Sequence, residues 1–260
     1  MIVTPKKFLG QHFLKDLNIA QNIADSLNVN GPTNVLEIGP GMGVLTQFLL
    51  QNPSINLQVV ELDRESVVYL NENFPALKGR ILAEDFLKLD IGDLFDGEPF
   101  YVIGNYPYNI SSQIFFKVLE YRDRVPVCSG MIQKEVAERM ASKPNCKAYG
   151  ILSVLLQAFY DIEYLFTVHE YVFDPPPKVK SAVIRMVRND VKKLDCDESL
   201  FIKVVKTSFN QRRKMLRNSI AQLVSKESPL LKDPIMTKRP EQLSVQDFIE
   251  LTNKVQQEII

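Results

Sequence analysis

The chain has 260 residues, of which 45% are hydrophobic and 24% are charged, which is the composition of a globular protein and excludes a disordered one. Its 31 basic and 31 acidic residues cancel, so net charge alone indicates no nucleic-acid partner. No apolar run approaches the roughly 20 residues that span a bilayer, so we expect no membrane partner.

Runs rich in β-branched and aromatic residues alternate with helical patterns over the first two thirds of the chain. The expected strands are residues 34–38, 57–62, 80–85, 99–104, 125–132, a run near 157–166, and 181–187. The expected helices include residues 44–51, 64–73 and 112–121. Strands separated by helical crossovers predict a mostly parallel seven-stranded sheet with helices on both faces. The last strands lie close together around Pro175–Pro177, which predicts an antiparallel hairpin at the sheet edge.

Beyond about residue 195 the strand signals stop, and apolar residues recur at helical spacing. We therefore expect an α/β, Rossmann-like domain over residues 1–194 and a small α-helical domain over residues 195–260. Residues 201–217 carry six basic side chains and no acid, which suits either a phosphate backbone or a solvated helix face. If Phe209 packs inward, helical spacing puts Arg213 and Arg217 on one face. The candidate RNA-binding residues are Arg212, Arg213, Lys214 and Arg217.

The segment from Val35 to Gly43 predicts a buried strand, a glycine-rich turn and then a helix. Glycines such as Gly39 and Gly41 let the backbone turn tightly and approach a ligand closely. The GxGxG spacing differs from the GxGxxG of dinucleotide sites, and the P-loop pattern is absent. By itself, the turn is equally compatible with a plain strand–helix connection.

Acidic residues end three of the expected strands. Glu61, at the end of the second strand, is placed to accept hydrogen bonds from ribose hydroxyls, and Asp85 is placed to meet an adenine amino group. A single strand-end acid is often only a helix cap, but three such strands form a coherent row. This negative row disfavours a phosphate-bearing cofactor and favours a cationic one. S-adenosylmethionine therefore fits better than NAD.

A loop with the pattern (Asn/Asp)-x-Pro-(Tyr/Phe) follows the fourth expected strand and is typical of methyltransferases that act on amino groups. The side-chain oxygen of Asn105 and the carbonyl of Tyr106, held by Pro107, can accept both N–H bonds of an exocyclic amine. This arrangement aims the nitrogen lone pair at a methyl donor. Tyr108 offers an aromatic face for a base taken out of its stack. The alternative interpretation is an ordinary strand-end turn.

With these residues in place, the chain resembles the ribosomal RNA adenine dimethyltransferase family, and most closely its bacterial small-subunit branch. The likeness extends over residues 7–14, 37–43, 60–63, 105–111, 133–136, 147–153, 173–183 and 209–214. It implies a class I methyltransferase domain and transfer of two methyl groups from S-adenosylmethionine to N6 of each of two adjacent adenosines. The implied substrate is a stem-loop near the 3′ end of small-subunit (16S) ribosomal RNA in a partly assembled 30S particle. A cytoplasmic monomer is expected.

The resemblance also implies roles for individual residues. It implies cofactor contacts at His12, Leu14, Gly39, Glu61, Asp85 and Asn105. It further implies that Tyr108 and Phe173 sandwich the target adenine. This chain has His12 where the family commonly has Asn, and Tyr106 where it commonly has Leu.

Other functions remain open from the sequence. The related large-subunit adenine methyltransferase that confers macrolide resistance is the nearest enzyme, although segments 147–150 and 209–214 favour the small-subunit branch. A non-catalytic assembly factor would not need the loop at Asn105, and a metabolic oxidoreductase fits the GxGxG turn poorly. Three cysteines without a CxxC pair predict reduced thiols, and with only two histidines we expect no metal.

Overall fold

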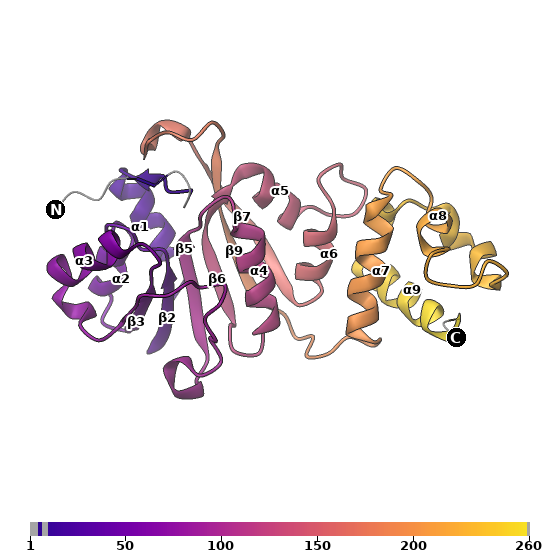
Figure 1. The fold of residues 1–260 in the computed structure, drawn as a ribbon, viewed down its shortest axis with the longest axis horizontal. Helices are drawn as coiled ribbons and strands as arrows, with labels where there is room; N and C mark the ends of the chain where they lie inside the picture. Colours follow the sequence, from indigo (N-terminus) through magenta and orange to yellow (C-terminus); the bar gives the residue numbers. More distant parts are fainter. Residues whose placement is uncertain (1–4, 7–9, 259–260) are drawn as a thin grey trace. The chain divides into compact units, whose positions relative to one another are not determined.

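A seven-stranded sheet forms the centre of the larger part of the described chain (Figure 1). The computed structural model describes residues 5–6 and 10–258. The strands, in spatial order, are β4 (Ile81–Leu82), β3 (Ile55–Val60), β2 (Thr33–Ile38), β5 (Phe100–Asn105), β6 (Val127–Gln133), β9 (Ser181–Arg188) and β7 (Tyr160–Val168). This order confirms the predicted α/β, Rossmann-like fold.

The strands at the middle of the sheet run parallel, so their carboxyl ends meet at one edge. Ile38, the last residue of β2, pairs with Val60 of β3 on one side and with Gly104 of β5 on the other. The last two strands lie side by side at the sheet edge as predicted, with β7 outermost and β9 next to it, and β9 runs antiparallel to β6. The residues that follow β2, β3 and β5 are thus brought together, where open α/β sheets bind ligands.

The strand predicted over residues 80–85 is wrong in its second half. Only β4 pairs in the sheet, and the chain then turns at Asp85. Oδ1 of Asp85 accepts a hydrogen bond from the N–H of Leu87 at 3.0 Å, and its carbonyl accepts from the N–H of Lys88 at 2.9 Å. Aspartate stabilises turns in this way by bonding to the backbone two residues on, which ends the strand before Asp85.

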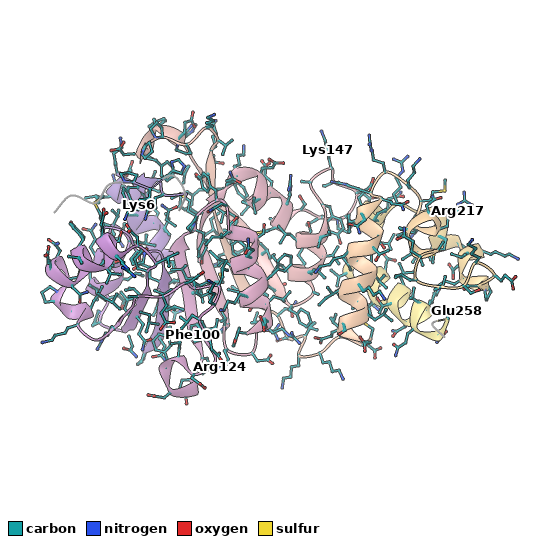
Figure 2. The ribbon with its side chains drawn as sticks, in the orientation of Figure 1. Lys6, Phe100, Arg124, Lys147, Arg217 and Glu258 are labelled. Carbon is teal, nitrogen blue, oxygen red and sulfur yellow. The ribbon has the colours of Figure 1, made fainter. Side chains whose placement is uncertain are left out.

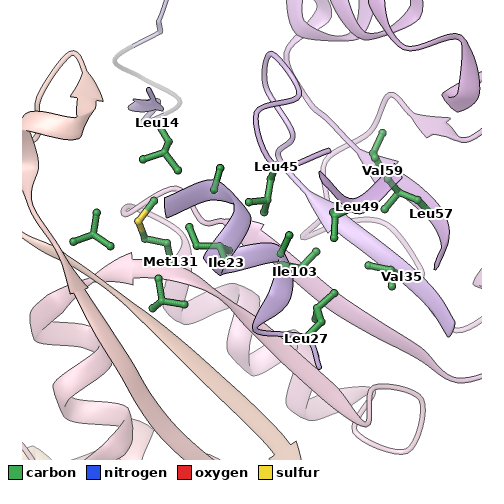
Figure 3. Close-up of a cluster of buried hydrophobic side chains, with 14 of the residues drawn as sticks. Leu14, Ile23, Leu27, Val35, Leu45, Leu49, Leu57, Val59, Ile103 and Met131 are labelled. Atoms are coloured by element: carbon green, nitrogen blue, oxygen red, sulfur yellow. The ribbon is translucent and has the colours of Figure 1, made fainter. Parts of the chain in front are cut away.

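Five helices connect or flank these strands, and α1 illustrates how they pack. These helices are α1 (Leu17–Asp25), α2 (Thr46–Gln51), α3 (Arg64–Asn73), α4 (Ser111–Glu120) and α5 (Lys134–Ala141). The cap of α1 is Asp16, whose Oδ1 accepts from the N–H of Asn18 at 2.9 Å. Its buried face places Ile23 in one cluster with Val35 and Met131 from the strands (Figure 3). Burial of this apolar stripe fixes α1 against the sheet.

Two short strands form a separate pair that the sequence does not predict. β1 (Phe13–Leu14) runs antiparallel to β8 (Phe173–Asp174), with Leu14 opposite Phe173. Just beyond, the N–H of Lys15 donates to the carbonyl of Val172 at 2.8 Å. This pairing brings the N-terminal segment to the segment that precedes the proline triplet. Residues 7–9, which belong to the N-terminal motif, lie outside the described residues.

A second compact unit contains residues 138–160 and 189–260. Its helices are α6 (Ile151–Gln157), α7 (Glu198–Asn210), α8 (Leu216–Ile220) and α9 (Val245–Glu258). Phe209 of α7 lies between Tyr149 and Phe248, with ring centroids 6.3 and 5.9 Å apart. Phe209 thus packs inward, and these aromatic contacts explain why residues 138–160, which the sequence pattern assigns to the first domain, group with the C-terminal helices. The division of function between residues 1–194 and 195–260 stays a prediction.

None of the helices in the described part of the chain combines the length and the apolar character that a membrane crossing needs.

Candidate active site

The glycine-rich turn after β2 forms the floor of a cleft at the carboxyl edge of the sheet. Gly39 and Gly41 have φ of +65° and +56°, a backbone region that favours glycine. The N–H of Gly39 donates to the carbonyl of Val60 at 2.9 Å, which holds the turn against the end of β3. A Cβ at Gly41 would come within 3.1 Å of the Phe13 ring, whereas the space beside Gly39 is open. The backbone therefore faces the cleft directly at Gly39.

The carboxylate of Glu61 joins this turn to the strand beside it. One oxygen accepts from the N–H of Gly41 at 3.0 Å, and the other accepts from the N–H of Asp63 at 2.8 Å. Glu61 is only 5% exposed, and burial raises its pKa, although hydrogen bonds from backbone N–H groups oppose this rise. A carboxylate offers about four lone-pair sites, so two remain for a ligand. The backbone thus fixes the direction of the remaining acceptor sites.

Glu37 is a second buried acid, beneath the turn. Its side chain is 1% exposed, and Oε2 accepts from the hydroxyl of Thr46 at 2.7 Å. Burial raises the pKa of Glu37 to about 8 and the charge of Glu61 adds to the rise, while the Thr46 hydrogen bond opposes it. Glu37 is therefore mostly protonated at neutral pH and can donate a hydrogen bond, so its role differs from that of Glu61.

An ion pair connects the N-terminal segment to the β3–α3 turn. Nζ of Lys6, labelled in Figure 2, bonds to Oδ1 of Asp63 and lies 3.1 Å from Oε1 of Glu65. Burial opposes ionisation of Asp63, but hydrogen bonds from Lys6 and the Ser66 hydroxyl hold its pKa below the usual value. Asp63 is therefore charged, caps α3 and holds the described N-terminal residues near Glu61.

The side-chain amide of Asn105 is oriented by the N-terminal segment. Nδ2 of Asn105, the last residue of β5, donates to the backbone carbonyl of His12 at 3.2 Å. This contact places the amide nitrogen on the side of His12, so Oδ1 is the acceptor left for another donor. The predicted acceptor atom is thus oriented by a residue 93 positions away in the sequence.

Tyr106 holds the loop after β5 from inside the core. Its ring is 1% exposed and occupies the space beside Gly104 and Gly130, where added Cβ atoms would come within 2.9 and 2.6 Å of it. Its hydroxyl donates to the carbonyl of Ser129 at 2.7 Å, and its N–H donates to the carbonyl of Met131 at 3.0 Å. The tyrosine that replaces the family's common leucine thus fixes the backbone just before Pro107.

Tyr108 and His12 stack at the mouth of the cleft. Their ring centroids are 5.4 Å apart with an interplanar angle of 30°, and the Tyr108 hydroxyl hydrogen-bonds to that of Ser181. Nδ1 of His12 donates to the carbonyl of Pro175 at 2.7 Å. The His12 ring therefore contacts both the loop after β5 and the proline triplet, and its backbone carbonyl accepts the hydrogen bond from Asn105.

The cleft brings together most of the residues predicted from the sequence. It has an empty volume of about 1070 Å³ and is lined by the predicted residues His12, Leu14, Gly39, Gly41, Glu61, Asp85, Asn105, Tyr106, Pro107 and Tyr108. Leu62 and Phe86 also line it and were missed. Each directly follows a predicted acid, and this position is the signal that could have identified them. Their apolar side chains give the cleft walls that suit a planar ring.

Phe173 does not lie with these residues. Its side chain is 1% exposed, packs in the core cluster with Leu14 and Met131, and is absent from the cleft lining. Burial of a phenyl ring stabilises this position by about 1.5–3 kcal/mol. The predicted sandwich of adenine between Tyr108 and Phe173 thus requires the Phe173 ring to leave the core, and it stays a prediction.

The basic residues of the second unit do not share one helical face. α7 ends at Asn210 and α8 begins only at Leu216, so the expectation of Arg213 and Arg217 on one continuous helix is wrong. Nη2 of Arg212 donates to the carbonyl of Lys147, which turns this side chain back onto its own unit. Lys147 and Arg217 are labelled in Figure 2. Arg213, Lys214 and Arg217 are exposed.

Comparison with known proteins identifies the family of this chain. The family model described as ribosomal RNA adenine dimethylase matches residues 3–257. The chain belongs to this family. Proteins named "Ribosomal RNA small subunit methyltransferase A" from Phocaeicola vulgatus and Parabacteroides distasonis are 66% and 70% identical to it. The alignments cover 98% and 96% of this chain and 91% and 94% of the relatives.

Solved structures show the same fold. A dimethyladenosine transferase from Plasmodium falciparum superposes with a TM-score of 0.76 at 22% identity, over 94% of this chain and 98% of that one. The 23S rRNA methyltransferase ErmE gives a TM-score of 0.68 at 24% identity, over 93% and 99% of the two chains. The predicted class I methyltransferase fold is confirmed.

The enzyme is an S-adenosylmethionine-dependent methyltransferase of this family, and the cleft fits that methyl donor. No lysine or arginine occurs among the described residues that line it, whereas Glu61 and Asp85 do. A phosphate-bearing cofactor would lack a countercharge here, but S-adenosylmethionine has no phosphate and carries a sulfonium. The predicted preference for it over NAD agrees with this lining.

The raised pKa of Glu37 predicts a pH-dependent stability. Because the pKa of Glu37 rises from 4.5 to about 8 on folding, its contribution to the free energy of unfolding is fully present below pH 4.5 and is lost as pH rises from there through 8. We expect the thermal unfolding temperature of the native protein to fall between pH 5 and pH 8 relative to Glu37→Gln, which mimics the protonated form. Over this pH range, the free energy of unfolding of the native protein falls by on the order of 4 kcal/mol relative to that of Glu37→Gln. Parallel pH profiles for the two proteins would show that Glu37 ionises normally.

Proposed function

We propose that this chain transfers two methyl groups to N6 of each of two adjacent adenosines in the 3′-terminal stem-loop of small-subunit (16S) ribosomal RNA. The substrate is the RNA in a partly assembled 30S particle, and the enzyme acts as a cytoplasmic monomer. Near full-length identity of 66–70% to relatives named "Ribosomal RNA small subunit methyltransferase A" carries this proposal. Such identity makes a change of substrate class between the proteins unexpected.

The acids of the cleft would hold the nucleoside part of the methyl donor. Glu61, whose carboxylate is oriented by two backbone N–H groups, has acceptor sites left for the two ribose hydroxyls. Asp85 accepts from the adenine amino group, and Leu62 and Phe86 cover the ring. His12 and Leu14 close the cleft from the N-terminal segment. The bound donor supplies an electrophilic methyl group on its sulfonium.

The Asn105 loop positions the attacking amine. An exocyclic adenine nitrogen is a poor nucleophile because its lone pair is delocalised into the ring. Oδ1 of Asn105 and the carbonyl of Tyr106 accept its two N–H bonds, which draws the nitrogen toward a tetrahedral shape. The hydrogen bond from Nδ2 to the carbonyl of His12 uses the amide nitrogen and leaves Oδ1 as the acceptor for the amine. The methylated amine then loses its proton to water, so no strong base is needed. Tyr108 stacks on the adenine.

Methylation of purified ribosomal subunits tests this function. Subunits from cells lacking this enzyme are incubated with the protein and methyl-labelled S-adenosylmethionine. We expect dimethyladenosine at two neighbouring adenosines of small-subunit RNA and no label in large subunits. Label in the large subunit would show instead that the protein is a large-subunit adenine methyltransferase. Binding to small subunits without transfer would assign a non-catalytic assembly factor instead.

Asn105→Ala tests the amine-positioning step. We expect the methylation rate to fall by about 100-fold or more, because the acceptor for the amine is lost. Affinity for the small subunit should change little, since Asn105 is not expected to touch the RNA backbone. Asn109→Ala, in an exposed position of the same loop, is the matched control and should keep nearly full activity. A near-normal rate for folded Asn105→Ala would refute the mechanism.

The exposed residues Arg213, Lys214 and Arg217 would bind RNA phosphates. Replacing all three by Glu should weaken small-subunit binding and reduce the salt dependence of the binding constant by about one power of salt per lost contact. Arg212 is kept, because its bond to Lys147 serves the fold. Lys192, Lys193 and Lys226, exposed in the same unit and outside residues 201–217, are replaced by Glu as a charge-matched control. An unchanged salt slope with a lowered melting temperature would assign the three residues to structural packing.

A further inference from the structure

An aromatic pair stands exposed on the segment between β7 and β8, which is salmon-coloured in Figure 1. Tyr171 lies in the short 3-10 helix η4 (Glu170–Val172) and is 71% exposed. Its ring stacks on that of His169, also exposed, with centroids 5.4 Å apart and an interplanar angle of 20°. Leaving so much aromatic surface in water gains the fold nothing. One face of Tyr171 is covered by His169, so the other face is available to a planar ligand.

The residues that flank Tyr171 are well packed in the core. Val168 before η4 and Val172 at its end are 1% and 7% exposed and belong to the core cluster. The carbonyl of Val172 also accepts from the N–H of Lys15 at 2.8 Å. The exposure of Tyr171 is therefore set by buried neighbours on both sides, and its ring is held in place before any ligand arrives.

The same segment leads directly into the active site. Four residues after Tyr171, the carbonyl of Pro175 accepts from Nδ1 of His12, which lines the cleft and stacks on Tyr108. At about 3.8 Å per residue, the Cα atoms of Tyr171 and Pro175 are at most about 15 Å apart. A strand that places one nucleotide on Tyr108 can therefore place a near neighbour on Tyr171.

Exposed lysines of this segment can contact a polyanion. From His169 to Ser181 the exposed acids and lysines are Asp174, Lys178 and Lys180, while Glu170, beside Tyr171, is half-buried. Lys15, paired through its backbone with Val172, adds a further exposed cation. None of the three lysines forms an ion pair with another described residue. An aromatic stacking surface combined with lysines is the arrangement by which proteins bind single-stranded nucleic acid.

We propose that Tyr171, backed by His169, binds an unpaired base of the substrate RNA close to the target adenosine, while Lys15, Lys178 and Lys180 contact the flanking phosphates. This inference rests on the proposed function. The ligand class is a single-stranded ribonucleotide of the substrate loop, because sequence-tolerant recognition of such loops relies on aromatic stacking. Tyr171 is thus a substrate-binding residue outside the reacting centre.

Two measurements on the full-length protein test this proposal. In the first, Tyr171→Ala should raise the KM for unmodified small subunits about tenfold, while kcat and the affinity for S-adenosylmethionine stay unchanged. Tyr171→Phe should restore the native KM, because it keeps the stacking face. Val68→Ala, which removes an exposed apolar side chain on α3, is the control and should have no effect.

The second measurement does not depend on methyl transfer. A hairpin RNA with two adjacent loop adenosines carries fluorescent 2-aminopurine at successive neighbouring positions. We expect the native protein and Tyr171→Phe to quench one of these positions and Tyr171→Ala to lose that quenching. Equal quenching by all three proteins, or a KM for Tyr171→Ala within twofold of native, overturns the proposal. If quenching depends on Tyr171 but small subunits are not methylated, the proposed function fails and the stacking site stands.

Discussion

The hydrogen bonds from the N–H groups of Gly41 and Asp63 to the Glu61 carboxylate fix the cleft on which the rest of the site depends. They join the turn after β2 to the end of β3, and they set the direction in which Glu61 can accept from a ligand. Glu37, buried below, avoids a second negative charge by keeping its proton, as its pKa of about 8 indicates. Two neighbouring acids thus have different roles because only one receives backbone N–H groups.

The N-terminal segment completes the site from the opposite side. His12 accepts from the Asn105 amide, stacks on Tyr108 and donates to Pro175, so it connects three segments that are far apart in the sequence. The Lys6–Asp63 ion pair and the β1–β8 pairing hold this segment in place. Methyl transfer is a positioning reaction, and these contacts orient the groups that position the amine. The side chain of His12 therefore contacts Tyr108 and Pro175, in addition to any contact that its backbone makes with the cofactor.

The sheet and most of the cleft could be predicted from the sequence, because nearly all-apolar runs such as residues 34–38 mark strands buried on both faces. The acids and Asn105 could be predicted because residues that end parallel strands meet at one edge. The β1–β8 pair could not, since two-residue strands carry no periodicity. The burial of Phe173 depends on the same long-range pairing. The end of α7 at Asn210 escaped prediction because residues 211–217 continue a helical pattern of charges.

The most direct test of whether this carboxylate organises the cleft is to measure, by titration calorimetry, the dissociation constant of S-adenosylmethionine for Glu61→Ala. The substitution removes acceptors for two hydroxyls, and each hydrogen bond to a charged group contributes roughly 1.5–3 kcal/mol. We expect the dissociation constant to rise at least tenfold, with Glu61→Gln intermediate because one acceptor oxygen remains. Circular dichroism confirms that each variant is folded. Native affinity in a folded Glu61→Ala variant would contradict the central role of Glu61.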